Sequence, residues 1–413
     1  MSARFKAPKG TFDVLPAQAV PRARVERAAA ELLGRAGYGR IETPAFEDTE
    51  LFERGVGEAT DIVRKEMFTF EDLGGRSVTL RPEGTAPIAR AYVEHGMHKL
   101  PQPVKLWYAG PFFRYEAPQA GRFREFSQIG AEAIGSDSPL VDAELIILLD
   151  ALLRELGVPE LELRLSSLGS GEARGAYREE LQAFLRAHES ELAREVRDRI
   201  DANPLRAFDS KDERTGAVMA QAPTILERLE GDDAEHFEAV RRLLDEAGIE
   251  YALDGTLVRG LDYYTRTVFS FGCPRLGAQS EVGGGGRYDA LVEQLGGPAA
   301  PAAGWAVGVE RIVLAAGSEE EQSTSDVFVA AADDRREAAL ALVGELRRAG
   351  LSADLDLAGR SLKGQMKQAD RVGARHTVIL DEDGGAVLRD MSSGEQTEVD
   401  PATLAETLLR GSG

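Results

Sequence analysis

The chain has 413 residues, of which 43% are hydrophobic and 29% are charged, and its 49 basic and 70 acidic residues give a formal net charge of −21. This balance is typical of a soluble globular protein and excludes a disordered chain, and the length predicts two or three domains. The apolar runs fall far short of the roughly 20 residues of a membrane-spanning helix, and a single cysteine, Cys273, excludes an internal disulfide and a multi-cysteine zinc site.

The first 21 residues contain basic side chains but no apolar core of a signal peptide, so we expect a cytoplasmic protein without membrane contact. A helix is predicted over 17–36, and Gly37 ends it. Strands are expected at 38–42, 67–70, 77–80, 104–110 and 123–134. Because these strands cluster rather than alternate with helices, they indicate an α+β fold with an antiparallel sheet.

Residues 172–250 are rich in Glu, Arg, Ala and Leu at helical spacing and predict a helical insertion. Strand composition returns at 258–271, and 304–316 combines a short strand with a helix. A polar stretch at 317–325 indicates a linker. We therefore expect a first domain that ends at about residue 325.

The pattern changes after this linker. Strands are predicted at 326–332, 352–355 and 376–380, with helices at 337–349 and 362–372 between them. Strands that alternate with helices predict a small α/β domain with parallel strands. This second domain covers 326–413.

The most informative stretch is 107–132, where two strands flank a turn that contains proline and glycine. One face of the second strand carries Phe126, Gln128, Gly130 and Glu132, and the other carries Ile129, Ala131 and Ala133. The apolar face should pack on the core. The polar face is either a solvated surface or a site, and the gap at Gly130 favours a site. Arg114 and Arg122 suit phosphate groups, and Phe126 suits stacking on a base.

Residues 80–85 form a second candidate cluster. Gly84 permits close approach of a ligand, and the carboxylate of Glu83 suits an ammonium group. The alternative is an ordinary strand-to-helix turn that Thr85 caps.

A third cluster contains Arg259 and Tyr264, which would face opposite ways in a regular strand. Both side chains enter one pocket only if Gly260 breaks the strand. The alternative is that the two adjacent tyrosines pack in the core or at a sheet edge.

The four consecutive glycines at 283–286 match neither the dinucleotide fingerprint nor a phosphate-binding P-loop. They either admit a substrate to the backbone or allow tight strand packing. Arg311 opens a predicted helix, where its charge is unfavourable to the helix dipole, which marks it as a candidate site residue. His95 and His98 lack a third ligand nearby, and we expect no protein-held metal.

A basic stripe is predicted in the second domain. It consists of Arg360, Lys363, Lys367, Arg371 and Arg375, whose spacings of 3, 4, 4 and 4 place them on one helical face if the helix extends to Arg375. The stripe is either a solvated face or a groove for nucleic-acid phosphates.

Several of these motifs together resemble those of the histidyl-tRNA synthetases, a family of class II aminoacyl-tRNA synthetases. Residues 37–52 with Pro44 resemble the class II dimer motif. A resemblance to the second class II motif is carried by Phe113, Arg114 and Glu116, followed by Arg122 and Phe126. A resemblance to the third class II motif is carried by Gly308, Glu310 and Arg311. Residues 259–269 and 284–289 resemble the two histidine-specific signatures of the family. The resemblance covers nearly the whole chain.

The resemblance implies a class II antiparallel sheet with flanking helices, a helical insertion and a small α/β anticodon-binding domain. It also implies a homodimer that forms histidyl-adenylate from L-histidine and ATP with Mg²⁺ and transfers the histidine to tRNA-His. The implied ATP-binding residues are Arg114 at the α-phosphate, Arg122 and Arg311 at the γ-phosphate, Phe126 on the adenine and Glu116 beside it. Arg114 and Arg259 are the implied catalytic residues.

The implied histidine-binding residues at the ammonium group are Glu83, Thr85 and Gln128, and those at the imidazole nitrogens are Glu132 and Tyr264. Arg259 is implied at the carboxylate, and Tyr288 is implied to close the pocket. Tyr263 is also an implied histidine-binding residue. The implied tRNA-binding residues are Gln119 at the acceptor end and Arg360, Lys363, Lys367 and Arg371 at the anticodon. A non-catalytic paralogue that regulates histidine biosynthesis is the alternative. Such a paralogue lacks the C-terminal domain and has a degraded signature at 259–269, whereas both are present here.

Overall fold

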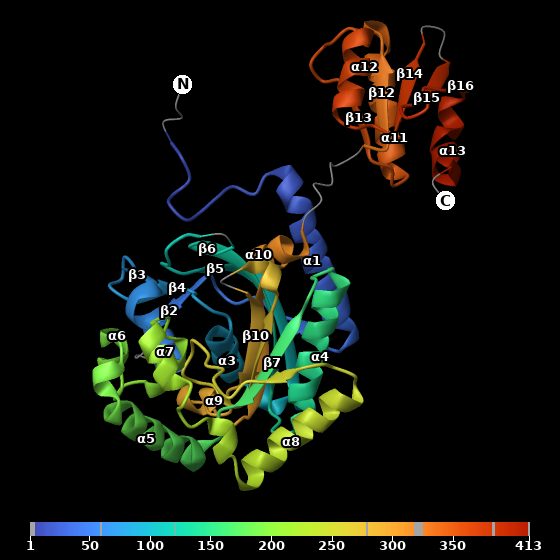
Figure 1. The fold of residues 1–413 in the computed structure, drawn as a ribbon. Helices are drawn as coiled ribbons and strands as arrows, with labels where there is room; N and C mark the ends of the chain where they lie inside the picture. Colours follow the sequence, from blue (N-terminus) through green and yellow to red (C-terminus); the bar gives the residue numbers. More distant parts are fainter. Residues whose placement is uncertain are drawn as a thin grey trace. The chain divides into compact units, whose positions relative to one another are not determined.

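The computed structural model describes residues 5–57, 60–119, 121–277, 280–317, 325–381 and 385–411. The chain forms two compact units, one comprising Met1–Val14 and Pro21–Ser318 and the other Leu15–Val20 and Glu319–Gly413 (Figure 1). Most of the predicted linker at 317–325 lies outside the described residues.

An eight-stranded sheet forms the centre of the larger unit (Figure 1). In spatial order its strands are β1 (Gly39–Arg40), β5 (Val104–Phe113), β6 (Glu125–Ile134), β11 (Ala302–Gly308), β10 (Glu281–Arg287), β9 (Thr265–Gly272), β7 (Glu162–Ser167) and β8 (Ala252–Leu253). The six inner strands pair antiparallel, and the short strand at each edge pairs parallel to its neighbour. The predicted α+β class with an antiparallel sheet is confirmed.

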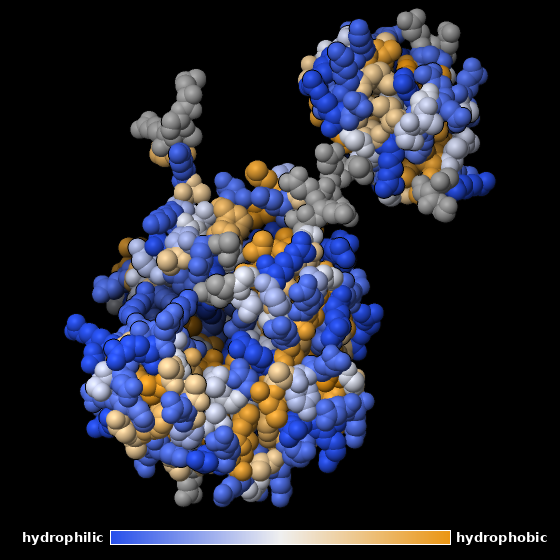
Figure 2. Space-filling view, viewed as in Figure 1, coloured by the Kyte–Doolittle hydropathy of each residue, from blue (hydrophilic) through white to orange (hydrophobic). Residues whose placement is uncertain are grey.

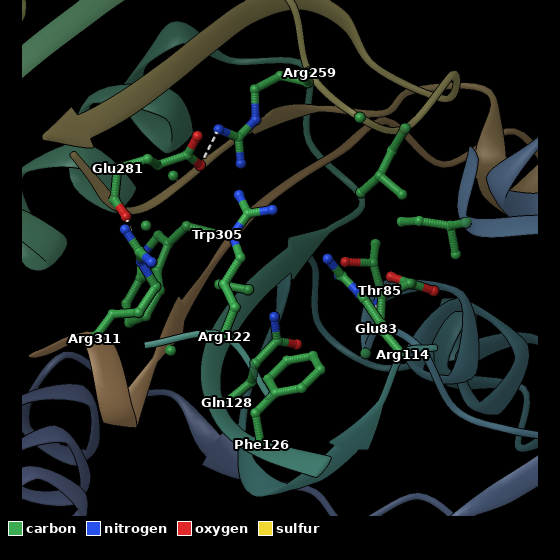
Figure 3. Close-up of a pocket in the computed structure, with 18 of the residues that line it drawn as sticks. Glu83, Thr85, Arg114, Arg122, Phe126, Gln128, Arg259, Glu281, Trp305 and Arg311 are labelled. Atoms are coloured by element: carbon green, nitrogen blue, oxygen red, sulfur yellow. Dashed lines mark hydrogen bonds and ion pairs between the residues drawn. The ribbon is translucent and has the colours of Figure 1, made fainter. Parts of the chain in front are cut away.

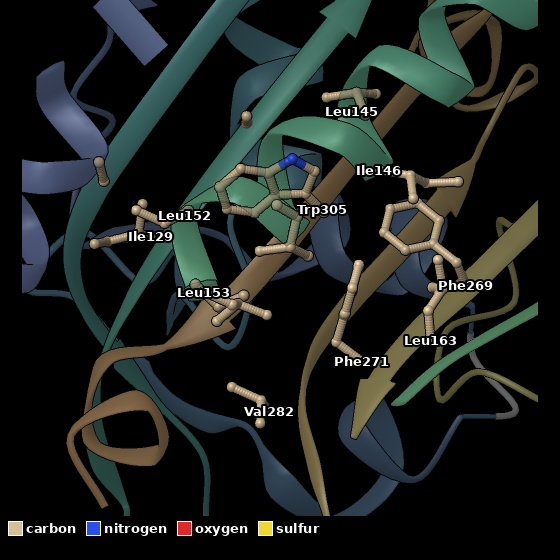
Figure 4. Close-up of a cluster of buried hydrophobic side chains, with 14 of the residues drawn as sticks. Ile129, Leu145, Ile146, Leu152, Leu153, Leu163, Phe269, Phe271, Val282 and Trp305 are labelled. Atoms are coloured by element: carbon tan, nitrogen blue, oxygen red, sulfur yellow. The ribbon is translucent and has the colours of Figure 1, made fainter. Parts of the chain in front are cut away.

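One face of this sheet packs against helices and forms the main hydrophobic core (Figure 4). The helices are α1 (Pro16–Arg35), α4 (Pro139–Glu155), α8 (Gly231–Glu246) and α10 (Val309–Ala316). Ile129, Ala131 and Ala133 of β6 are fully buried on this face, as their alternation predicts. Burial of each large apolar side chain, such as Phe269, contributes about 1.5–3 kcal/mol. The opposite face of the same strands carries a second hydrophobic cluster, in which Tyr108, Phe112 and Val268 are buried, together with polar side chains.

The strands predicted at 67–70 and 77–80 pair as a hairpin in a second, three-stranded sheet of β2 (Phe46–Asp48), β4 (Ser77–Leu80) and β3 (Phe68–Glu71). The helices beside it are α2 (Thr49–Val56), the π-helical turn Ile62–Glu66 and α3 (Thr85–Glu94), while α9 (Leu291–Gln294) packs on α2 and α3. The chain therefore passes directly from β4 into α3 through residues 81–84.

Helix α8 falls within the bounds predicted for the helical insertion, 172–250, but it packs on α4 and belongs to the core of the large sheet. The rest of the predicted insertion contains α5 (Gly171–Ala187), α6 (Arg194–Arg197) and α7 (Glu213–Met219) with short 3-10 turns. It has a hydrophobic core of its own, in which Leu181 and Leu185 are fully buried. Its polar contacts with the rest of the unit include an ion pair of 2.9 Å between Arg199 and Asp61. The insertion is therefore a small subdomain held against the rest of the larger unit.

The smaller unit contains a five-stranded sheet in the order β13 (Ala353–Leu355), β12 (Val327–Ala331), β14 (His376–Leu380), β15 (Ala386–Asp390) and β16 (Gln396–Val399). Its helices are α11 (Arg336–Arg348), α12 (Leu362–Arg371) and α13 (Leu404–Gly411). The three predicted strands are parallel, but β15 and β16 add an antiparallel pair that the sequence pattern did not predict.

Two further expectations need correction. The predicted strand at 258–271 begins only at Thr265, and residues 258–264 form a loop. The five-residue basic stripe required a helix that extends to Arg375, but α12 ends at Arg371, because the turn at Gly373 has a positive φ of 64°.

Hydrophilic side chains cover most of the visible face of each unit (Figure 2). Among the described helices, the structure contains none whose length and apolarity would allow it to cross a bilayer.

Candidate active site

A cavity of about 450 Å³ opens on the polar face of the large sheet. Its lining brings together Glu83, Thr85, Arg114, Glu116, Arg122, Phe126, Gln128, Arg259, Tyr263, Tyr264 and Arg311, all of them predicted site residues (Figure 3). They come from the β4–α3 turn, the β5–β6 hairpin, the loop before β9 and the start of α10. Segments more than 200 residues apart therefore converge on one site.

Glu132 lies in the floor behind this cavity and is fully buried. Its two carboxyl oxygens accept hydrogen bonds from Thr85 Oγ1 at 2.8 Å and Tyr288 Oη at 2.6 Å. The pKa of Glu132 is raised to about 8, mainly by burial and in part by the nearby Glu83 carboxylate, although the two hydrogen bonds oppose the shift. Glu132 and Tyr288 are therefore adjacent to the cavity rather than part of its exposed wall.

We expect Glu132→Gln to stabilise the protein more at pH 8 than at pH 5. The folded state keeps a proton that the unfolded chain loses above about pH 4.5, so the contribution of Glu132 to stability is complete at low pH and decreases as the pH rises toward 8. The melting temperature of the variant minus that of the wild type should increase by roughly 5 °C between these pH values. The measurement is thermal unfolding followed by circular dichroism, with the exposed Glu125 of the same strand changed to Gln as the control. A difference that does not change with pH would contradict the raised pKa.

Glu83 caps a helix, a structural role that was not predicted from the sequence. Its carboxylate accepts hydrogen bonds from the backbone N–H groups of Thr85 at 2.7 Å and Ala86 at 2.9 Å, so it caps the N-terminus of α3. The alternative in which Thr85 provides the cap is wrong, because the Thr85 hydroxyl donates to Glu132 instead. Burial raises the pKa of Glu83, while the two backbone donors lower it. One carboxylate is thus fixed at the cavity wall by a helix terminus.

The charged wall of the cavity consists of Glu116 and three arginines, Arg114, Arg122 and Arg311, and Figure 3 labels the arginines. Glu116 accepts from Arg122 at 3.1 Å and lies 3.9 Å from Arg114. The guanidinium of Arg114 also donates to the carbonyl of Pro82 and covers the ring of Phe126 at 5.4 Å. Burial lowers the pKa of Arg311, and the neighbouring Arg122 lowers it further. Positive charges held this closely favour an anion between them.

Arg259 projects from the loop that interrupts the predicted strand. Its guanidinium forms an ion pair of 2.5 Å with Glu281, and only 13% of its side chain is exposed. Burial disfavours the charge, but Glu281 more than offsets this and holds the pKa of Arg259 above its ordinary value. The loop conformation brings both Arg259 and Tyr264 to the cavity, which is the arrangement that required a broken strand.

The helical insertion anchors this loop. Arg174 of α5 donates to the backbone carbonyls of Tyr264 at 2.6 Å and Asp262 at 3.4 Å. Asn203 donates to the Asp262 carboxylate at 3.0 Å. The position of the loop that carries Arg259 therefore depends on the insertion.

The glycine run at 283–286 lies inside strand β10. A methyl group added at Gly285 would lie 1.9 Å from the carbonyl oxygen of Gly304, and one at Gly286 would lie 2.5 Å from that of Thr267. Of the two alternatives left open, tight strand packing explains these two positions. Gly283 and Gly284 also line the cavity.

Several cavity residues were not predicted from the sequence. Glu281, Arg206, Tyr108 and Trp305 all line the cavity. Glu281 also accepts a hydrogen bond from Arg311 through its backbone carbonyl at 2.5 Å, so it contacts two of the arginines. Arg206 comes from the insertion, and only its basic character in an acidic chain could have indicated it.

The predicted tRNA-binding residues lie elsewhere. Gln119 is exposed in the β5–β6 loop and pairs with Arg122 through the backbone. Lys363, Lys367 and Arg371 are exposed on α12, and their spacing of four places them on one face. Arg360 precedes the helix and pairs with Asp356 at 2.5 Å, so the continuous stripe predicted for one helix is shorter than expected.

No group of three or more His, Cys, Asp or Glu side chains that could hold a metal ion occurs in the described ranges. Among the carboxylates that line the cavity, Glu116 and Glu281 are paired with arginines.

Comparisons with known proteins identify relatives of both units. A family model described as histidyl-tRNA synthetase matches residues 10–312, and one described as anticodon binding domain matches residues 325–410. The histidine–tRNA ligase of Rubrobacter xylanophilus is 52% identical over 409 residues and that of Streptomyces avermitilis is 50% identical over 405 residues, with 96% of each chain covered in both cases.

Solved structures agree with these matches. The apo histidyl-tRNA synthetase of S. aureus matches with a TM-score of 0.82 and 35% identity over 98% of this chain and 99% of that one. A Bacillus halodurans structure, described as an ATP phosphoribosyltransferase regulatory subunit/histidyl-tRNA synthetase, has a lower TM-score of 0.66 and covers 87% of this chain and 95% of that one.

Proposed function

The chain belongs to the histidyl-tRNA synthetase family and is a histidine–tRNA ligase in its activity, and from this premise we propose which residues perform each step. The reaction joins L-histidine to ATP to form histidyl-adenylate and then transfers histidine to tRNA-His with release of AMP. The observation that carries the residue assignment is the convergence of Arg114, Arg122, Arg259 and Arg311 on one cavity.

The arginines suit the nucleotide part of the reaction. Arg122 and Arg311 bind the γ-phosphate, and an anion between them relieves the repulsion that lowers the pKa of Arg311. Arg114 holds the α-phosphate while the histidine carboxylate attacks, so that it stabilises the negative charge that develops there. Phe126 stacks on the adenine in place of the Arg114 guanidinium that now covers its ring, and Glu116 lies beside the base.

Arg259 contacts both the histidine carboxylate and the α-phosphate. Its charge is secured by Glu281, and the loop that carries it is held by the insertion. A guanidinium fixed between the two reacting groups aligns them and stabilises the transition state. Arg259 and Arg114 are therefore the proposed catalytic residues.

Histidine binds on the side of the cavity that contains the buried carboxylates. The ammonium group is bound by Glu83, Thr85 and Gln128, and the two imidazole nitrogens are bound by Glu132 and Tyr264. Tyr263 packs on Tyr264 with ring centroids 4.8 Å apart, and Tyr288 holds Glu132 through its hydroxyl. A ring with two polar nitrogens requires two polar partners, which an acid and a phenol supply.

Mg²⁺ accompanies ATP in this proposal. Mg²⁺ keeps several water ligands and prefers phosphates with one or two carboxylates to a cage of protein ligands. The cavity fits this preference, because Glu116 and Glu281 are paired with arginines and the described residues contain no group of three or more His, Cys, Asp or Glu side chains that could hold the ion alone. Glu116 and Glu281 are the side chains that would contact the hydrated ion, whose chemistry is to neutralise phosphate charge.

The remaining assignments concern the whole molecule. We propose that residues 1–325 form the catalytic domain and 326–413 the anticodon-binding domain, that the protein is a cytoplasmic homodimer, and that Gln119 contacts the tRNA acceptor end. Sedimentation at several protein concentrations tests the dimer.

Histidine-dependent exchange of pyrophosphate into ATP tests the function. We expect exchange with histidine and not with other amino acids, because only histidine offers both imidazole nitrogens to Glu132 and Tyr264. A folded protein that gives no exchange at saturating substrates would support the non-catalytic alternative.

We expect Lys363→Glu combined with Lys367→Glu to weaken tRNA-His binding by about 10-fold or more, because each lysine that contacts a phosphate releases counterions. Pyrophosphate exchange should be unchanged, since neither residue lies at the cavity. The measurement is a filter-binding titration at fixed salt. Arg348→Glu combined with Arg410→Glu, on two other helices of the same unit, is the charge-matched control. Unchanged tRNA affinity in the lysine variant would show that α12 presents only a solvated face.

A further inference from the structure

Arg174 of α5 contacts the loop at 258–264 from outside the cavity. Its guanidinium donates through Nη1 to the carbonyl of Tyr264 at 2.6 Å and through Nη2 to the carbonyl of Asp262 at 3.4 Å. Arg174 itself is absent from the described residues that line the cavity. One planar guanidinium therefore joins two carbonyls that lie two residues apart, and it fixes the backbone turn at Tyr263.

The charge of Arg174 is costly to place at this position. Burial lowers the pKa of Arg174, and the nearby Asp262 carboxylate opposes this shift only in part. The two carbonyl oxygens that accept from its guanidinium are neutral. A buried charge that is satisfied in this way adds little net stability, so its effect on the shape of the loop is the better account of its presence.

Asp262 is the point at which the loop is fixed to the rest of the larger unit. Its N–H donates to the carbonyl of Val56 at 3.2 Å, and its own carbonyl accepts from Arg174. At the other end, the loop begins next to Leu257, whose side chain is buried in a hydrophobic cluster. The short span between these two fixed points contains Arg259, so the position of the Arg259 guanidinium depends on where Asp262 is held.

The first turn of α5 gives the Arg174 side chain a rigid base. Just before the helix, the Ser170 hydroxyl donates to the Asp233 carboxylate at 2.8 Å, and Arg266 Nε of strand β9 donates to the same carboxylate at 2.9 Å. Arg266 has a positive φ of 46°, a strained conformation that persists only where the surrounding contacts determine the backbone. These contacts tie α5 to β9, so Arg174 and the end of the loop are fixed relative to each other.

We propose that Arg174 is a positioning residue of histidyl-adenylate formation, which holds the loop so that the Arg259 guanidinium reaches the histidine carboxylate and the α-phosphate. This inference rests on the proposed function of Arg259. A misplacement of about 1 Å, caused by a substitution outside the reacting groups, lowers a rate by as much as about 100-fold. Through Arg174, the helical insertion therefore contributes to the activation of histidine.

Arg174→Met tests the proposal, because methionine removes both hydrogen bonds and retains part of the side-chain volume. We expect the rate of adenylate formation in a single turnover, at saturating histidine and ATP, to fall by about 10- to 100-fold. Arg178→Met is the matched control. Arg178 lies one turn further along α5 and donates to the carbonyls of Asp201 at 2.8 Å and Ala202 at 2.9 Å, both within the insertion. The control should keep the wild-type rate, and circular dichroism should show both variants folded at the assay temperature.

A double substitution shows whether Arg174 acts through Arg259. In an Arg259→Ala background, Arg174→Met should lower the rate by less than about 3-fold, because the side chain that Arg174 positions is gone. If the two effects multiply, or if Arg178→Met slows the reaction as much as Arg174→Met does, the inference is overturned.

Arg174→Lys restores a donor but not the planar fork, so it should recover part of the rate. It takes the place of the methionine variant in the same double substitution if that variant does not fold. A wild-type rate in Arg174→Met beside a slow Arg259→Ala overturns the inference alone. A wild-type rate in Arg259→Ala overturns the proposed function of that residue as well.

Discussion

Arg259→Ala should lower the kcat for histidyl-adenylate formation by about 100-fold or more. Loss of a preorganised donor at a developing charge typically has an effect of this size. Removal of the guanidinium also leaves the Glu281 carboxylate without its 2.5 Å partner at the edge of the cavity, where it would repel the α-phosphate. Both effects act on the transition state, so kcat should change more than the KM for histidine.

Single-turnover formation of the adenylate, measured by rapid quench, separates this step from product release. Arg164→Ala is the control, since Arg164 lies in the same sheet, pairs with Asp254 at 3.3 Å and does not line the cavity. Arg259→Lys should recover only part of the rate, because an ammonium cannot bridge two anions as a planar guanidinium does. A near-normal kcat for Arg259→Ala would show that the assigned role is wrong.

The alternation along β6 shows how much the sequence could establish. Period-two spacing separated Ile129, Ala131 and Ala133 from the polar side chains, and the structure places the two sets on opposite faces of the sheet. This alternation depends only on neighbouring residues of one strand, and it persists in an antiparallel sheet because only one face of the sheet packs against the helices. Strand β7 (Glu162–Ser167) has the same alternation at Leu163 and Leu165, both buried, and was detectable by the same reasoning.

The loop at 258–264 shows where local reasoning fails. Its composition is that of a strand, but Arg174 of the insertion binds its backbone and Asn203 of the insertion binds the Asp262 side chain, both from more than 50 residues away in the sequence. Contacts between residues this far apart in the sequence override the local propensity for a strand. For the same reason Glu281 could not be predicted, since nothing in its neighbourhood along the chain indicates that Arg259 lies opposite it.

The gap at Gly130 illustrates a third limit. The absence of a side chain was correctly associated with the site, but a glycine only makes space and does not specify what fills it. The partner across the strand pair is Tyr108, and this depends on the register of β5 against β6. Register is set by the whole hairpin and not by either strand alone.

Gly304→Ala should abolish most histidine activation, although it adds only one methyl group. Gly304 is opposite Glu132 in the β6–β11 pair, and a methyl group there would lie 1.6 Å from Glu132 Oε2 and 2.7 Å from the carbonyl oxygen of Ala131. The carboxyl group must move, which breaks the bonds from Thr85 and Tyr288. At about 1–3 kcal/mol for each buried group left unsatisfied, kcat/KM for histidine should fall by at least about 100-fold.

Gly272→Ala in the same sheet distinguishes this displacement from a general loss of strand packing. A methyl group at Gly272 would have its nearest contact at 3.6 Å, which is ordinary van der Waals distance. This control should keep its kcat/KM for histidine, whereas Gly304→Ala should lose it even at temperatures where circular dichroism shows a folded sheet. The KM for ATP should change less than that for histidine in Gly304→Ala, because the carboxyl group that must move is held by Thr85 and Tyr288, which are both assigned to histidine. If both substrates were affected equally, the methyl group would be acting through the sheet as a whole, and Glu132 would have no special place in histidine recognition.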